Sequence, residues 1–232
     1  MLVQNIRKLR EKENKLMKKI IWIFGQSATG KKTLINKLLA KDTKALEELG
    51  LENKNIVACQ NTIVDTKRIT PSQPDSFIYD DTTMQEDNEY FSRDNAKNRR
   101  ACIMTDTVRF LNSNADVILI KGQDNDIWPH RGDIVKYFLD NFNNRDDVEI
   151  DVYILTVQND AIWQQRIGNK EWFKNFSNKE EVMKNMLAER KSNKHERRVA
   201  EAFKEFNIPI YFIEAGENNY YFRTFQSDLE RR

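Results

Sequence analysis

The sequence contains little glycine and little proline. Only 7 of its 232 residues are glycine and 4 are proline, whereas long flexible linkers are rich in one or both. Hydrophobic residues make up 39% of the chain and charged residues 32%, so a core can form beneath a highly charged surface. This length and composition predict one α/β domain with a lid or an insertion.

Cysteines are few, and no apolar run is long. Cys59 and Cys102 have the spacing of neither a metal site nor a disulfide framework, so we expect free, buried thiols in a reducing cytoplasm. No apolar stretch approaches the roughly 18 residues of a membrane span. The basic start of the chain also lacks the apolar block and cleavage site of a secretory signal. We therefore expect a cytoplasmic protein without a membrane partner.

Neither sign of charge is in large excess. The 38 basic and 36 acidic side chains give a net charge of +2. Overall charge therefore provides no argument for nucleic-acid binding, and contact with DNA or RNA would require a local basic patch.

Short β-branched runs alternate with helical patterns along the chain. Strands are predicted at residues 20–24, 55–60, 77–81, 116–120, 150–157 and 208–214. Helices are predicted at residues 33–39, 94–112 and 131–142, and a long helical stretch at 160–206. Strands that alternate with helices predict a three-layer α/β fold, with a parallel sheet, helices on both faces and the ligand beyond the carboxyl ends of the strands.

The strongest motif lies between the first strand and the first helix. It reads Gly25-Gln26-Ser27-Ala28-Thr29-Gly30-Lys31. The glycines allow the backbone to curl so that successive N–H groups point at one phosphate, and the helix N-terminus adds its positive end. Lys31 supplies a full charge for the β- and γ-phosphates. A buried strand before the loop and a helix after it are the context of a P-loop, so these residues, with Lys32 and Thr33, are predicted to bind a nucleoside triphosphate.

The position after Lys31 departs from the usual P-loop pattern. Lys32 stands where a serine or threonine normally binds magnesium. Thr33 is the nearest hydroxyl that could serve as the metal ligand, and Ser27 and Thr29 are alternatives. The backbone cradle is intact, so triphosphate binding is still expected, while the metal geometry is in doubt.

A second departure follows the predicted strand at 116–120. Many P-loop enzymes end this strand with an aspartate that holds the magnesium ion, but here the next residue is Lys121. Asp124 and Asp126 follow on the loop, and one of them is expected to act as a displaced metal ligand or general base. The alternative is an ordinary polar turn, which this composition would also produce.

Transfer to an acceptor hydroxyl requires a carboxylate that orients the hydroxyl and accepts its proton. The adjacent pair Asp80 and Asp81 is the best candidate and Asp65 a poorer one, although the pair could instead cap a helix or lie in a solvated loop. Three arginines on the predicted 94–112 helix could bind an acceptor phosphate or simply face water: Arg99, Arg100 and Arg109.

The helical stretch at 160–206 is predicted to form a lid. In small P-loop kinases, lid arginines close on the transferring phosphoryl group and exclude water. Arg166 is the leading candidate for this role. Arg190 and Arg197 share a helical face and are further candidates, with a solvated basic face as the alternative.

From about Lys18 to Glu214 the chain resembles the nucleoside, nucleotide and polynucleotide kinase branch of the P-loop proteins. The resemblance rests on the element pattern, the Gly25–Lys31 loop and the segment around Arg166. It implies a kinase domain at residues 18–216 with its lid at about 160–206, flanked by a leader helix or extension at 1–17 and a tail at 217–232. It also implies ATP and Mg²⁺ as cofactors and a monomer or homodimer.

Within that branch, the chain is similar in general style to phage enzymes that phosphorylate hydroxymethylated pyrimidines such as 5-hydroxymethyluracil in DNA. Residues 118–126 and the compact lid carry this similarity. It implies DNA modification in the cytoplasm of a host cell, with the target base extruded from the stack. Aromatic side chains that could stack on such a base, or that could simply fill the core, are Tyr90, Phe91, Trp128, Trp172 and Phe173.

Three other functions are consistent with these patterns. A related kinase could act on a free nucleoside or nucleoside monophosphate. A non-catalytic nucleotide-binding module could have lost its metal chemistry, with Lys32 and Lys121 as the sign of that loss. A partner-coupled ATPase or GTPase is the least favoured, because the chain lacks the guanine-specifying Asn-Lys-x-Asp; residues 193–196 read Asn-Lys-His-Glu.

Overall fold

The structure is a computed structural model that describes residues 17–59, 93–127, 133–157, 159–216 and 220–224. Its strands are β1 (Lys18–Gly25), β2 (Ile56–Ala58), β3 (Val117–Lys121), β4 (Val148–Val157), β5 (Ile210–Ala215) and β6 (Tyr220–Thr224). Its helices are α2 (Lys31–Leu39), α3 (Thr43–Glu48), α5 (Arg93–Leu111), α6 (Ile134–Phe142), α7 (Asp160–Gly168), α8 (Glu171–Lys174), α9 (Lys179–Lys191) and α10 (Lys194–Lys204), with a 3₁₀ turn η3 (Asp124–Ile127).

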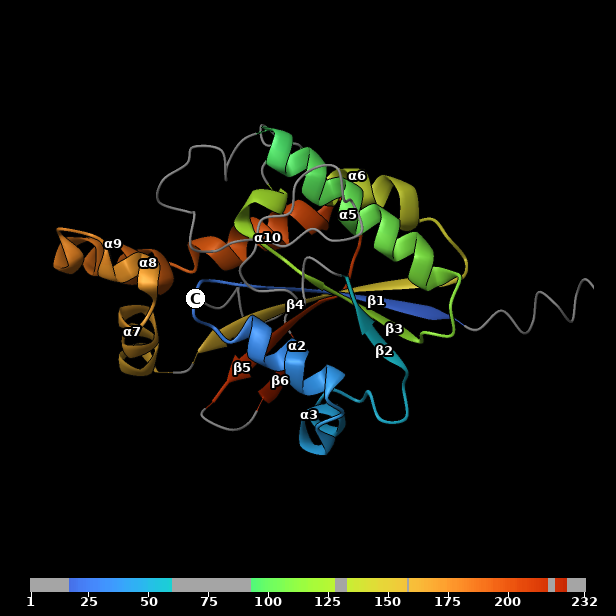
Figure 1. Cartoon of the computed structure of the whole chain (residues 1–232), viewed down its shortest axis with the longest axis horizontal. Coiled ribbons are helices and arrows are strands. Elements are labelled where there is room, and N and C mark those ends of the chain that lie inside the picture. The colour runs from blue at the N-terminus through green and yellow to red at the C-terminus, as the bar shows by residue number, and fades with distance from the viewer. Residues whose placement is uncertain (1–16, 60–92, 128–132, 158, 217–219, 225–232) are drawn as a thin grey trace, which may run out of the picture.

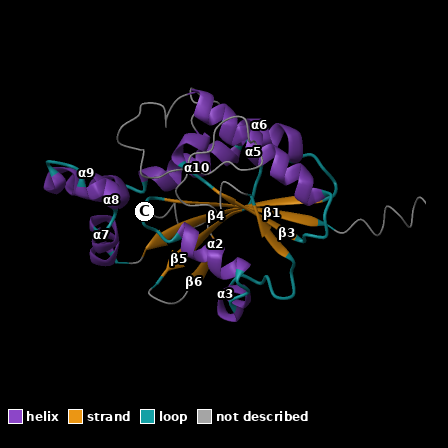
Figure 2. Cartoon of the chain, viewed as in Figure 1, coloured by secondary structure: helices purple, strands orange, loops and turns teal. Residues whose placement is uncertain are grey.

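The described strands form one sheet (Figure 2). Their order across the sheet is β2-β3-β1-β4-β5-β6. The first five strands run parallel, and β6 pairs antiparallel with β5 at the edge. Helices cover both faces of the sheet (Figure 1). The predicted three-layer α/β fold is therefore confirmed.

Strand β1 is buried on both faces, as its continuous apolar run predicted. Ile20, Trp22 and Phe24 point to the face covered by α5, α6 and α10 (Figure 1). Ile21 and Ile23 point to the opposite face, which α2 and α3 cover. Each fully buried side chain of this size contributes roughly 1.5–3 kcal/mol through the hydrophobic effect, so β1 anchors both layers of the core.

The predicted strands at 20–24, 55–60, 116–120, 150–157 and 208–214 correspond to β1 to β5, with ends shifted by a few residues. The long helical stretch is divided into α7, α8, α9 and α10. The predicted strand at 77–81 and the leader helix lie outside the described residues. Strand β6, which lies in the segment expected to be a tail, was not predicted.

Helices α7 to α9 project beyond the carboxyl ends of the parallel strands, whereas α10 packs on the sheet (Figure 1). Their movement as a lid stays a prediction. None of the helices in the described part of the chain combines the length and the apolar character required to cross a membrane.

The sheet topology has a switch point between two central strands. After β1 the chain continues into α2 on one face of the sheet, whereas after β3 it continues through η3 to α6 on the other face. Strands β1 and β3 are neighbours, so their two loops diverge. Ligands of parallel α/β sheets bind at such switch points, outside the carboxyl ends of the strands.

Both cysteines are free and buried, as predicted. Burial raises the pKa of the Cys59 thiol well above its ordinary value of 9.0, and the charge of Asp106 raises the pKa further. Only a thiolate reacts quickly with disulfide reagents, so we expect neither Cys59 nor Cys102 to react in the folded protein, and both to react in denaturant. Fast labelling of the folded protein at neutral pH would contradict a closed core.

The raised pKa of Cys59 also affects stability at high pH. The unfolded thiol ionises near its ordinary pKa, whereas the folded Cys59 thiol stays protonated, so the free energy of unfolding decreases as the pH rises above 9.0.

Candidate functional site

The loop after β1 makes its first turn at a residue that has to be glycine. Gly25 has φ +143°, a value that side chains disfavour. A Cβ atom there would lie 2.5 Å from the carbonyl oxygen of Leu155 and 2.7 Å from Oγ1 of Thr29. The loop is therefore pressed against β4 at this point, and only a residue without a side chain allows the approach.

Two further residues curl the loop. Ala28 has φ +64° and Gly30 has φ +94°, so both adopt left-handed backbone conformations. The hydroxyl of the buried Thr29 donates to the carbonyl oxygen of Gln26 at 2.9 Å, which ties the loop to itself. Alternation of left- and right-handed conformations makes a concave surface of backbone N–H groups that suits an anion.

Helix α2 begins directly at this loop. Gly30 is its N-cap and has no side chain that could accept from the first N–H groups of the helix. The first intrahelical bond runs from the N–H of Leu34 to the carbonyl of Gly30, so the preceding N–H groups have no partner within the helix. Together with the helix dipole, these donors favour a bound phosphate.

The three residues that open α2 are placed differently. The ammonium group of Lys31 donates to the carbonyls of Gly25 and Gln26, the latter at 3.0 Å, so it lies within the curve of the loop. Lys32 is half-buried, whereas Thr33 is exposed. Helical spacing places Thr33 on the outer side of α2, away from the buried Leu34 and Ile35. This orientation does not favour Thr33 as a metal ligand.

We expect substitution of the two glycines of the loop to lower the free energy of unfolding by different amounts. In Gly25→Ala, the strained φ and the two close contacts are expected to destabilise the fold by about 2–3 kcal/mol. In Gly30→Ala, the new Cβ meets nothing within 4 Å, and only the left-handed conformation costs energy, about 1–2 kcal/mol. Urea unfolding of both variants measures this difference, and equal costs would contradict the packing of Gly25 against β4.

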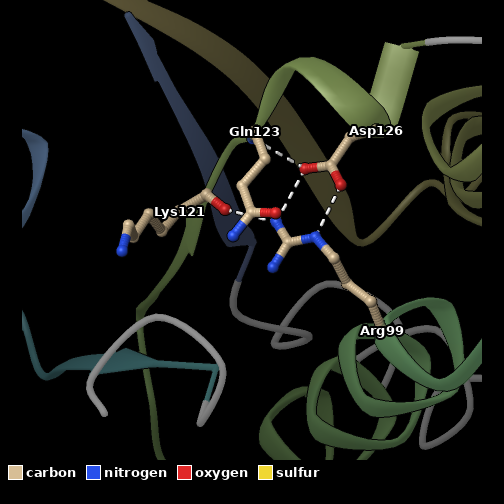
Figure 3. A network of polar contacts seen from close by, with 4 residues as sticks. All are labelled: Arg99, Lys121, Gln123 and Asp126. Atoms are coloured by element: carbon tan, nitrogen blue, oxygen red, sulfur yellow. Dashed lines mark hydrogen bonds and ion pairs between the residues drawn. The ribbon is translucent and has the colours of Figure 1, made fainter. Parts of the chain in front are cut away.

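The end of β3 lies on the other side of the switch point, beside the end of β1. The N–H of Gly122 donates to the carbonyl of Ile23 at 2.7 Å, which extends the pairing of β3 with β1. Val117 and Leu119 point to the α2 face of the sheet, and alternation places the Lys121 side chain on the same face. In Figure 3 this side chain points away from Arg99 and Asp126.

A buried ion pair fixes the loop after β3 (Figure 3). Arg99 of α5 donates to both carboxylate oxygens of Asp126, from Nε at 2.6 Å and from a terminal nitrogen at 2.7 Å. Asp126 also accepts from the N–H of Gln123 at 2.9 Å, and Arg99 donates to the carbonyl of Lys121 at 2.6 Å. Asp126, one of the two expected metal ligands or bases, therefore uses its carboxylate to hold the loop in place.

The other arginines of α5 have partners as well. The Arg100 guanidinium lies 4.4 Å from the ring centroid of Tyr137. Arg109 forms an ion pair with Asp106 at 2.7 Å and lies over the ring of Phe110. None of these contacts by itself indicates a site for an acceptor phosphate.

Helices α7 to α9 contact the phosphate loop directly. The indole N–H of Trp163 on α7 donates to the carbonyl of Ser27 at 2.9 Å. Ala28 packs against the small core of this segment, whose buried members are Val157, Trp163, Ile167 and Phe173. The half-buried Trp172 packs against the same core, so two of the aromatic residues considered for base stacking, Trp172 and Phe173, contribute to packing.

The predicted lid arginines differ in their surroundings. Arg190 of α9 donates to Asp160 at 2.8 Å and to the carbonyl of Val157, and its guanidinium lies 5.5 Å from the Trp163 ring centroid. Arg197 of α10 is exposed and donates to the carbonyl of Ser192. Arg166 is partly exposed on the last turn of α7. In this arrangement Arg190 joins α9 to α7 and β4.

The contact between Trp163 and Ser27 predicts an effect on ligand affinity. Trp163→Phe removes the hydrogen bond and keeps an aromatic ring in the core, so the Ser27 carbonyl is held less firmly. We expect roughly 2- to 10-fold weaker nucleotide binding, the usual value of one hydrogen bond. Titration calorimetry with ATP measures it, and an affinity equal to that of the wild type would contradict a role of Trp163 in shaping the loop.

Several predicted residues lie outside the described residues, namely Asp65, Asp80, Asp81, Tyr90, Phe91 and Trp128. Asp124 is the first residue of η3, and its side chain is also outside the described part. The structure brings together the loop 25–31, Lys32 and Lys121 at the carboxyl ends of the central strands β1 and β3. Sequence patterns did not indicate the contact of Trp163 with this loop, nor the pairing of Arg99 with Asp126.

Comparison of the chain with protein-family models and with curated proteins finds no match. The functional interpretation therefore depends on the geometry of the loop 25–31 and on the chemistry of the residues around it.

Proposed function

We propose that the chain is an ATP-dependent kinase that transfers the γ-phosphoryl group to a hydroxyl of a nucleotide or nucleic acid. The observation that supports it best is the loop between β1 and α2. Its backbone curls at Gly25, Ala28 and Gly30, the following helix is uncapped by a side chain, and Lys31 reaches into the curve. Such a loop suits the phosphates of a nucleoside triphosphate.

In phosphoryl transfer, the protein mainly positions the reacting groups and stabilises the charge that develops on the phosphate oxygens. The acceptor oxygen forms a bond to the γ-phosphorus, the bond from that phosphorus to the β–γ bridging oxygen breaks, and ADP leaves. The hydroxyl proton passes to a carboxylate, for which Asp80 and Asp81 remain the candidates. Lys31 stabilises the charge that develops on the β- and γ-phosphate oxygens.

The proximity of α7 to the phosphate loop supports a role for this segment in the transfer. Trp163 and Ala28 connect the two, and Arg166 lies on the same short helix as Trp163. A segment that rests on the loop can exclude water from the transferring group. We therefore retain Arg166 as the leading lid arginine; Arg190 would first have to leave Asp160.

The most specific acceptor that we propose is a hydroxymethylated pyrimidine in phage DNA. With this acceptor, the protein would modify DNA in the cytoplasm of the host. A free nucleoside or nucleoside monophosphate is the alternative within the same chemistry. An enclosed pocket would favour the small acceptor and an open basic groove the polymer.

A non-catalytic nucleotide-binding module is the second candidate. It is favoured by the lysines at positions 32 and 121, where P-loop enzymes ordinarily hold magnesium. Such a module would bind a triphosphate through the same loop without turning it over.

Acceptor-dependent ATP consumption distinguishes the two candidates. The purified protein is incubated with ATP and Mg²⁺ without acceptor, with nucleosides and nucleotides, with plain DNA ends, and with DNA that contains 5-hydroxymethyluracil. The kinase proposal expects ADP formation with one acceptor class, and its loss in Lys31→Ala. Lys37→Ala, on the outer side of the same helix, is the matched control and is expected to retain turnover. ATP binding without turnover on any acceptor would leave only the non-catalytic module.

A further inference from the structure

The two protein positions that hold Mg²⁺ in P-loop enzymes both carry lysine in this chain. The usual ligands are a serine or threonine at the start of the helix after the loop and an aspartate near the end of a neighbouring strand. Here Lys32 follows Lys31 at the start of α2, and Lys121 ends β3. An ammonium group has three donors and no lone pair, so it cannot bind a metal ion.

The sheet brings these two positions to the same region. Lys121 is paired in register with Ile23, two residues before Gly25. Its side chain lies on the face of the sheet that α2 covers, because Val117 and Leu119 point to that face. Helix α2 contacts both β1 and β3, and its first turn, with Lys32, lies at the carboxyl end of these strands.

Neither Asp126 nor Thr33 takes the place of the usual metal ligands. Asp126 lies toward the opposite face and accepts three hydrogen bonds from Arg99 and Gln123. Thr33 is exposed on the outer side of α2. Throughout the described ranges, moreover, no group of three or more histidine, cysteine, aspartate or glutamate side chains is placed to hold a metal ion. Among the described residues, the two usual Mg²⁺ positions and these two candidates therefore do not form the usual ligand set for the ion.

The same residues fit a bare polyphosphate. The ammonium groups of the three lysines are full positive charges, and each attracts a phosphate oxygen that comes near it. A triphosphate without a metal ion carries up to four negative charges at neutral pH, and the lysines supply the positive charge that Mg²⁺ otherwise contributes. The backbone N–H groups of the loop add donors that need no metal.

We propose that the loop 25–31 binds the nucleoside triphosphate as a metal-free anion, with Lys32 and Lys121 joining Lys31 as its cationic ligands. This inference rests on the proposed function, in which the loop binds a triphosphate. It concerns the binding step alone, so its test does not require the acceptor.

Titration calorimetry of the full chain with ATP, once in excess Mg²⁺ and once in EDTA, tests the inference. The dissociation constants in the two buffers are expected to agree within about threefold, or the affinity to be higher in EDTA. Binding that weakens about tenfold or more in EDTA would overturn the inference and leave nucleotide binding by the proposed kinase intact. No binding in either buffer would overturn both.

Restoring the usual ligands provides a second test. The double variant Lys32→Thr with Lys121→Asp is expected to lose at least about tenfold in ATP affinity in EDTA and to regain affinity with Mg²⁺. Lys37→Thr, the same change on the outer side of α2, is expected to bind as the wild type does in both buffers. Thermal unfolding shows whether the double variant is folded. If it is not folded, the single variant Lys121→Gln is titrated with ATP in EDTA instead. Binding that is about tenfold weaker than that of the wild type supports the inference, and unchanged binding overturns it.

Discussion

Lys31→Ala is expected to lower acceptor-dependent phosphoryl transfer by about 100- to 1,000-fold, the usual cost of removing one donor that faces developing charge. The ammonium group of Lys31 lies inside the loop, where it donates to the carbonyls of Gly25 and Gln26. A bound phosphate would replace these carbonyls as its partner, because an anion attracts the ammonium more strongly. Initial rates at saturating ATP measure the effect on kcat.

The fold should tolerate this change. Lys31 is only half-buried, and the Gly25 and Gln26 carbonyls to which it donates belong to the loop rather than to the core, so we expect a melting temperature close to that of the wild type. Lys31→Arg keeps the charge and changes its shape, and it is expected to recover part of the activity. Full activity of Lys31→Ala in a folded protein would contradict a catalytic role for this loop.

Asp126→Ala is expected to destabilise the protein by about 3–5 kcal/mol, the usual cost of breaking a buried ion pair by removing one partner. Both side chains are almost completely inaccessible, with exposed fractions of 1% for Arg99 and 0% for Asp126. Removal of the carboxylate takes from the buried guanidinium the counter-charge that Asp126 supplies and two of its hydrogen bonds. Urea denaturation measures the change in the free energy of unfolding.

A surface pair provides the control for this prediction. Lys136 and Asp140 are separated by 3.1 Å on α6, and both are about half exposed. Asp140→Ala is expected to cost only about 0.3–0.5 kcal/mol, because water screens the pair. The double variant Arg99→Met with Asp126→Leu should be more stable than Asp126→Ala alone, since it buries no unpaired charge. Equal costs for Asp126→Ala and Asp140→Ala would show that the buried pair does not hold the loop.

The parts of the fold that could be predicted are those with a local pattern. A run of five apolar residues identified β1, and the spacing of Leu34, Ile35 and Leu38 identified α2. The loop between them was predicted from its glycines, whose conformations follow from their lack of a side chain. Strand β6 was not predicted, because its sequence alternates little between apolar and polar residues and follows a polar stretch of sequence.

The parts of the site that could not be predicted depend on contacts between distant residues. Trp163 and Ser27 are 136 residues apart in the sequence, and Arg99 and Asp126 are 27 apart. No periodicity within one element reveals such pairs, because they exist only once the sheet has brought the elements together. The exposure of Thr33 is different: it was proposed as the metal ligand, although helical spacing from Leu34 and Ile35 would have indicated the outer side of α2.

The position of β1 in the sheet also bears on the order in which the protein can fold. Its two neighbours, β3 and β4, come from much later in the chain. During synthesis, this strongly apolar strand therefore leaves the ribosome well before either partner exists, and it has to remain unpaired until they emerge. Topologies that depend on such non-local pairing fold slowly and expose unpaired strand edges in the meantime. The nascent chain is thus most prone to aggregation before β3 and β4 have been made.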